Sequence, residues 1–209
     1  MNSSENSEQG AQRGPTGARR QDILQTLAVL LEQPQGTKIT TALLAQKLKL
    51  SEAALYRHFA SKARMYEALI EFIEQTLFSR INRIATEMPP GMAQVEAILT
   101  LLLGFSDKNP GMTRVLTGEV LQHEDGRLLA RMRQLNDRLE TSLRQSLRLM
   151  SPSHSEAMAP KDRTVAVQAD MLMSIVNGRW HRFSTSEFSR SPLQDWDTLW
   201  SLLMTSLKT

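Results

Sequence analysis

The stretch "TTALLAQKLKLSEAALYRHF", residues 40–59, contains two short helical patterns separated by a turn of only a few residues. In the second pattern Leu55 and Phe59 are four residues apart, so both side chains face the same way. Ser51 precedes that pattern and is a favoured N-cap, because its hydroxyl accepts a hydrogen bond from a free amide of the first turn. Two short helices joined by a tight turn are a candidate helix-turn-helix motif.

Helical periodicity continues on both sides of this stretch, and strand-like alternation is almost absent. The helix expected over residues 92–108 is apolar on most sides, which predicts a central and buried position. The sequence therefore predicts an all-α protein of about nine helices. The expected ranges of seven of them are 40–48, 51–59, 62–88, 92–108, 112–122, 163–184 and 194–207, with a loop over 151–162. The first helix is expected to end at Pro34, with Ile23, Leu27, Leu30 and Leu31 on one face. A long amphipathic helix before the loop is marked by Leu128, Met132, Leu135, Leu139, Leu143 and Leu147.

Composition divides the chain into three segments. Residues 1–17 carry too few apolar side chains to form a core and are expected to be a disordered tail. A small lobe is expected over residues 18–62 and a larger one over 63–209. The third and fourth helices almost adjoin, so we expect rigid coupling between the two lobes.

The overall composition excludes several classes of protein. The chain has 41% hydrophobic residues, a net charge of +3 and no cysteine, which excludes disulfides and thiolate metal sites. No apolar run reaches the roughly 18 residues that a membrane span needs, and the N-terminus lacks the apolar region of a signal peptide. We therefore expect a cytoplasmic protein whose mildly basic charge permits, without requiring, a polyanionic partner.

In a helix-turn-helix protein the start of the second helix approaches base edges, while neighbouring side chains hold phosphates. Small side chains allow close approach and can touch a thymine methyl group. The residues that suit these roles are Ala53 and Ala54 toward bases, Thr40, Thr41, Tyr56 and Lys62 toward phosphates, and Arg57 toward either. Spacing alone is equally compatible with an ordinary helical hairpin whose surface carries these residues.

The longer stretch "ITTALLAQKLKLSEAALYRHFASKARMYEALI" resembles the DNA-binding signature of the TetR family. In that signature a serine-capped recognition helix ends in Leu-Tyr-x-His-Phe, and a lysine then starts the fourth helix. The matching residues here are Ser51, Leu55, Tyr56, His58, Phe59 and Lys62, so Ser51 and His58 join the candidate DNA-binding residues. Lys49 stands where the family usually has glycine, and Ala60 replaces a common proline. A left-handed conformation at Lys49 would cost about 1 kcal/mol.

Four segments, "SEAALYRHF", "LIEFIEQTLFSRIN", "LLLGFSDKNPGMTRVLTGEVL" and "SEFSRSPLQDW", resemble the nucleoid-occlusion branch of that family. The resemblance implies a homodimer that binds a palindromic site in double-stranded DNA, with one or more dimers per site. It also implies that the DNA-bound protein antagonises assembly of FtsZ, the bacterial tubulin homologue, so that no septum forms over the nucleoid. Residues 18–62 would then be the DNA-binding domain, and 63–209 a domain for dimerisation and partner binding.

The same resemblance supplies a set of candidate FtsZ contacts: Phe72, Arg80, Leu101, Gly104, Lys108 and Asn109. Phe72 and Arg80 are eight residues apart and share a face of the fourth helix, and Leu101, Gly104 and Lys108 form a stripe on the fifth. Without the resemblance, core packing of Phe72 and Leu101 and a close helix approach at Gly104 would be the simpler interpretation. Lys108 stands where we expect arginine, which keeps the charge but loses a bidentate fork.

Other patterns carry little chemistry. The four histidines lack metal-ligand spacing, and "HED" at 123–125 lacks a nucleophile nearby. "GRWHRF" at 178–183 favours packing and dimer contact over nucleic-acid binding, and we expect the helix over 163–184 and the last helix to pair with their copies in a second subunit. No enzymatic activity, metal or cofactor is expected. The alternative is a TetR-type transcriptional repressor released by a small molecule, which would need a cavity with convergent polar groups in the larger lobe.

Overall fold

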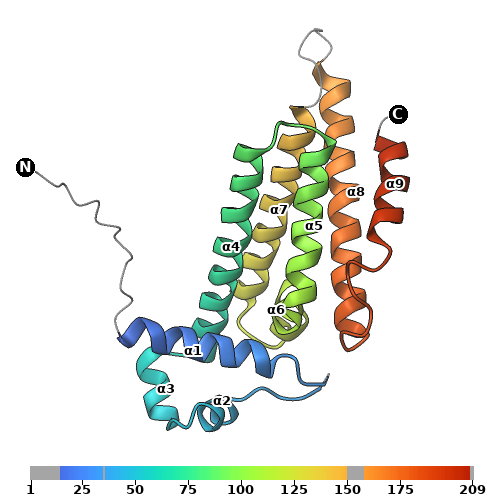
Figure 1. Cartoon of the computed structure of the whole chain (residues 1–209). Coiled ribbons are helices and arrows are strands. Elements are labelled where there is room, and N and C mark those ends of the chain that lie inside the picture. The colour runs from blue at the N-terminus through green and yellow to red at the C-terminus, as the bar shows by residue number, and fades with distance from the viewer. Residues whose placement is uncertain (1–14, 35, 150–157, 208–209) are drawn as a thin grey trace, which may run out of the picture.

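The computed structural model describes residues 15–34, 36–149 and 158–207. Over these residues the chain forms nine α-helices and one short 3-10 helix and no β-strand, which confirms the predicted all-α class (Figure 1). None of the described helices is long and apolar enough to cross a lipid bilayer. The elements are α1 (Pro15–Leu30), α2 (Thr41–Lys47), α3 (Glu52–His58), α4 (Lys62–Glu87), α5 (Met92–Lys108), α6 (Pro110–Leu116), η1 (Glu119–Leu121), α7 (Gly126–Arg148), α8 (Met158–Thr185) and α9 (Trp196–Leu207).

The first three helices are arranged across the remaining ones. In Figure 1, α1, α2 and α3 lie across one end of a bundle built from α4, α5, α7 and α8, and α9 lies outside α8. The apolar face of α5 forms the centre of the bundle, with Val95, Ile98, Leu99, Leu102 and Leu103 at most 1% exposed. The predicted central position of this helix is confirmed.

Three boundaries differ from the sequence-based expectation. α1 begins at Pro15, within the expected tail, because proline is favoured in the first turn of a helix; residues 1–14 lie outside the described residues. α8 begins at Met158, within the expected 151–162 loop, since the missing amide of Pro160 costs no hydrogen bond in a first turn. The single helix expected over 112–122 is wrong: Gly118 adopts φ 74°, which ends α6 and starts η1.

A close contact fixes the small lobe to the bundle. Gly111 of α6 lies against the α1 backbone, so that a Cβ atom at this position would lie 1.9 Å from the carbonyl oxygen of Ala28. Only glycine permits this approach, because the neighbouring atoms belong to a helix backbone that cannot rotate away. The contact positions α1 on the end of the bundle.

Gly111→Ala is therefore expected to lower the free energy of unfolding by about 1–3 kcal/mol, the usual cost of overpacking. Gly126→Ala is the matched control, because a Cβ there meets nothing within 4 Å. Chemical denaturation of both variants measures the difference. Equal midpoints for the two variants would contradict the close contact.

Candidate nucleic-acid interface and partner surface

Side-chain hydroxyls fix the start of each helix around the motif. Thr40 caps α2 by accepting a hydrogen bond from the amide of Leu43 at 3.1 Å. Ser51 caps α3 in the same way, accepting from the amide of Ala54 at 3.1 Å, as the sequence predicts. Both hydroxyls thus have a structural task at the two helix starts, in addition to the DNA contact predicted for each.

The turn between α2 and α3 requires the left-handed conformation anticipated at Lys49. Its φ is 54°, and the amide of the next residue, Leu50, donates to the carbonyl of Ala45 at 2.9 Å. This hydrogen bond closes the end of α2, which explains why glycine suits the position. Lys49 is exposed, so its ammonium group is free to approach a phosphate.

The exposed side of α3 brings most of the predicted DNA-binding residues together. Ala53, Tyr56 and Arg57 are exposed, and Ala54 is half-buried beside them. The Tyr56 hydroxyl lies 3.4 Å from Oγ1 of Thr41, which in turn donates to a carboxylate oxygen of Glu52 at 2.7 Å. Thr41 of α2 and Tyr56 of α3 therefore present neighbouring hydroxyl groups on one surface.

The other end of α3 is held by a residue that the sequence analysis missed. Arg20 of α1 donates from Nη1 to the carbonyl of His58, and its guanidinium lies 4.1 Å from the ring centroid of Phe59. The contact spans 38 residues of sequence, so no local pattern indicates it. Arg20 therefore connects the C-terminal end of α3, the recognition helix, to α1.

Lys62 contacts the larger lobe. Its ammonium group forms an ion pair with Glu124 and lies 5.6 Å from the ring centroid of Tyr66. Burial, and secondarily the charge of Glu124, raise the pKa of the Tyr66 hydroxyl. Next to Glu124, Asp125 caps α7, and its hydrogen bonds with Arg127 lower the pKa of the Asp125 carboxyl to about 2. The "HED" segment thus has structural contacts through Glu124 and Asp125.

The phosphate role of Lys62 stays a prediction, and the ion pair supplies a control for it. Lys62→Ala is expected to weaken binding to every DNA sequence and to reduce the salt slope by about one, the contribution of one phosphate contact. Glu124→Gln removes the same ion pair but keeps the ammonium group, so its salt slope should equal that of the unmodified protein. Fluorescence anisotropy over a salt series measures both slopes. Equal reductions in the two variants would assign the effect to the ion pair instead.

The six candidate FtsZ contacts lie outside the core. Phe72 is 41% exposed on α4, whereas its neighbour Ile73 is fully buried. Arg80 and Lys108 are exposed, and Leu101, Gly104 and Asn109 are half-buried. A Cβ added at Gly104 would meet only a methyl group of Leu193 at 3.9 Å, an ordinary contact, so no close helix approach requires glycine there. Core packing thus does not account for the exposed ring of Phe72, and close helix approach does not account for Gly104, whereas Leu101 is half-buried and packs against the core.

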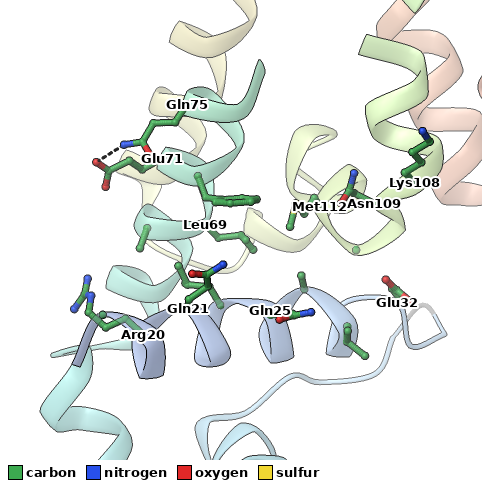
Figure 2. Close-up of a pocket in the computed structure, with 17 residues that line it drawn as sticks. Arg20, Gln21, Gln25, Glu32, Leu69, Glu71, Gln75, Lys108, Asn109 and Met112 are labelled. Carbon is green, nitrogen blue, oxygen red and sulfur yellow. Dashed lines mark hydrogen bonds between the residues drawn. The ribbon is translucent and has the colours of Figure 1, made fainter. Parts of the chain in front are cut away.

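A hollow of about 760 Å³ lies where α1, α4 and the α5–α6 junction meet (Figure 2). Of the six candidate contacts, Phe72, Lys108 and Asn109 line it, whereas Arg80, Leu101 and Gly104 do not. The α1 side contributes polar groups, among them Arg20 and Gln25. The hollow thus lies between α1, in the DNA-binding lobe, and the surface of α4 that carries Phe72.

The "GRWHRF" segment is a packing element at its apolar positions, as favoured from the sequence. Trp180 and Phe183 are buried, and the indole of Trp180 donates to the carbonyl of Leu102 at 3.3 Å. The described residues contain no group of three or more histidine, cysteine, aspartate or glutamate side chains that could hold a metal ion.

Matches to known proteins cover nearly the whole chain. The family model described as bacterial regulatory proteins, tetR family, matches residues 24–69, and the SlmA-like model described as Tetracyclin repressor-like, C-terminal domain, matches residues 90–208. The nucleoid occlusion factor SlmA of Alteromonas mediterranea is 47% identical over 183 residues, which cover 88% of this chain and 92% of the relative. The SlmA of Vibrio vulnificus is 45% identical over 191 residues, covering 91% and 96%.

Solved structures agree in fold. The transcriptional regulator FadR from Bacillus subtilis, in complex with stearoyl-CoA, superimposes with a TM-score of 0.70 over 88% of this chain and 96% of that chain. The sequences are 11% identical, so the similarity concerns the fold alone.

Proposed function

The chain belongs to the SlmA family of TetR-type nucleoid occlusion factors, and we propose that it binds palindromic chromosomal sites as a homodimer and, when bound, antagonises FtsZ assembly. As a member of that family it is a DNA-binding regulator rather than an enzyme. Its place of action is the nucleoid, where bound protein prevents a septum from forming over DNA.

The capped α2–α3 pair supports the DNA-binding part of this proposal. At the start of α3 the exposed Ala53 and its neighbour Ala54 face base edges in the major groove, and Arg57 in the last turn reaches a base or the backbone. The hydroxyls of Thr41 and Tyr56 reach the flanking phosphates. Lys49 adds a positive charge in the turn.

Exposed apolar groups on the last two helices support the homodimer. Val167 on α8 and Leu202 on α9 are 61% and 65% exposed, values that burial by a second subunit would lower. Gly178, on the exposed side of α8, has open space around it, which permits close approach by a helix of the partner. A two-fold dimer formed through these helices would match the symmetry of a palindrome.

The exposed ring of Phe72 beside the hollow is the observation that carries the FtsZ part. An aromatic side chain at the edge of a concave surface is a frequent anchor for a protein partner. Lys108 and Asn109 in the same hollow supply a positive charge and an amide, which suit the carboxylates and main chain of a bound segment. Since α1 forms another wall of the hollow, the site lies against the DNA-binding lobe.

The repressor alternative needs a ligand cavity among the helices of the larger lobe. The residues of α5 at its centre are instead mostly apolar, packed and buried, and the side chains of its buried Gln94 and Ser106 donate hydrogen bonds to the carbonyls of Met88 and Leu103. These features favour a protein partner over a small-molecule ligand.

Sedimentation velocity with labelled FtsZ tests the proposal. The protein on a duplex that it selects from a randomised pool is expected to carry FtsZ in a faster boundary, and a scrambled duplex should not. Unchanged FtsZ sedimentation with the selected duplex would overturn the FtsZ part. Release of the duplex by a small molecule would instead establish the repressor function.

A further inference from the structure

A buried positive charge lies at the joint between the two lobes. Arg114 of α6 is only 4% exposed, and its Nη1 donates to the carbonyl of Leu31 at 3.0 Å and also to that of Gln33. Leu31 and Gln33 directly follow α1, so their carbonyls lie at the C-terminal end of that helix, where carbonyls lack partners within the helix. Arg114 therefore caps the C-terminal end of α1 from the neighbouring lobe.

The other side of the same guanidinium faces the bundle. Its Nε lies 3.7 Å from a carboxylate oxygen of Glu119 in η1, and its centre lies 4.8 Å from the ring centroid of Phe188, in the loop between α8 and α9. Glu119 also accepts a hydrogen bond from the hydroxyl of Ser184 on α8. One side chain thus connects α1 with η1 and the α8–α9 loop.

This arrangement is costly for the fold. The Nε and Nη2 atoms of Arg114 are buried, and neither makes a hydrogen bond with the described residues. Burying a guanidinium with unmade hydrogen bonds is unfavourable. Replacing Arg114 alone by an apolar side chain would also leave Glu119 and the carbonyls of Leu31 and Gln33 without this partner, which is usually destabilising. The contacts of Arg114 across the joint, rather than its burial, therefore explain an arginine at this position.

Two residues of the α8–α9 loop, at and next to the ring that contacts Arg114, have strained backbone conformations. Phe188 adopts φ 66° and Glu187 φ 49°, in the left-handed region that side chains disfavour. The Phe188 ring is held between Arg114 and the ring of Phe183, whose centroid lies 5.1 Å away. Strained residues persist where surrounding contacts determine their conformation, and they are frequent at positions with a function.

We propose that Arg114 is a positioning residue that sets the orientation of the DNA-binding lobe relative to the dimerisation helices. The contacts run from Phe188 through Arg114 to the end of α1, and α1 holds the recognition helix through Arg20 and the carbonyl of His58. In a two-fold dimer this orientation fixes the separation of the two recognition helices. Arg114 therefore determines which half-site spacing the protein accepts. This inference rests on the proposed homodimer on a palindrome.

The test compares duplexes that differ only in the spacing of their half-sites. The palindrome selected by the protein is remade with one base pair added or removed at its centre, which moves the half-sites by about 3.4 Å and rotates them about the DNA axis. The unmodified protein should prefer the original spacing. Arg114→Met should reduce this preference by about two- to thirtyfold, the range that coupling residues produce. The control is Arg83→Met, which removes an exposed arginine of α4 and should keep the preference.

Fluorescence anisotropy and thermal unfolding together separate the outcomes. An equal loss of affinity on all three duplexes would show a merely structural role and overturn the proposal, and so would an unchanged preference. If Arg114→Met does not fold, Phe188→Leu carries the same test, because it removes the ring contact at a site in the α8–α9 loop. Failure of the unmodified protein to distinguish a palindrome from a single half-site would instead contradict the proposed homodimer.

Discussion

Phe72→Ala is expected to abolish antagonism of FtsZ while leaving affinity for DNA unchanged. Because the ring is 41% exposed and lies beside the hollow between α1 and α4, its loss removes contact area for a partner and little core packing. Truncating an aromatic anchor typically costs 2 kcal/mol or more, so FtsZ affinity should fall by about thirtyfold or more. Titration of DNA-bound protein with labelled FtsZ measures the change.

Phe78→Ala is the matched control, since it removes the same ring from the same helix. Phe78 is half-buried and lies 4.0 Å from the guanidinium of Arg138, so its replacement should lower thermal stability and retain FtsZ binding. If Phe72→Ala binds FtsZ as tightly as the unmodified protein does, the partner surface lies elsewhere.

Leu202→Glu is expected to convert the protein to a monomer and to weaken binding to its palindrome by about 100-fold or more. A carboxylate placed at the centre of a helical interface would lose its hydration without gaining a partner. A monomer then binds each half-site separately and loses the advantage of linked binding, which is commonly 10²–10⁴-fold. Sedimentation equilibrium and anisotropy on the palindrome report the two effects.

Leu149→Glu separates this effect from that of a new surface charge. Leu149 follows α7 and is 60% exposed, close to the 65% of Leu202, but it lies outside the proposed α8–α9 interface. The Leu149 variant should remain a dimer. A dimeric Leu202→Glu protein with full DNA affinity would contradict an interface through α9.

Local signals in the sequence were sufficient for much of the fold. The cap at Ser51 depends on residues within a few positions of each other and was predicted correctly. The left-handed conformation of Lys49, with φ 54°, was suggested by the resemblance alone, since the family usually has glycine there. The apolar periodicity of α7 likewise predicted its buried face, because a regular helix determines which side chains share a side. The break at Gly118 was missed, since apolar residues continue past it.

Contacts between distant segments could not be predicted in this way. Arg114 is 83 residues from Leu31, and Lys62 is 62 residues from Glu124, so neither pair leaves a pattern in the sequence. Phe72 and Ile73 are adjacent apolar residues, and periodicity left open which one is buried. Only the packing of α4 against its neighbours decides that Ile73 faces inward and Phe72 outward.

Pelleting of FtsZ polymers in the presence of the protein and its selected palindrome tests the central claim most directly. The DNA-bound protein is expected to lower the amount of polymer in the pellet, whereas the same protein with a scrambled duplex should lower it far less. A pellet that the DNA-bound protein leaves unchanged would contradict the proposed role in preventing septum formation over the nucleoid.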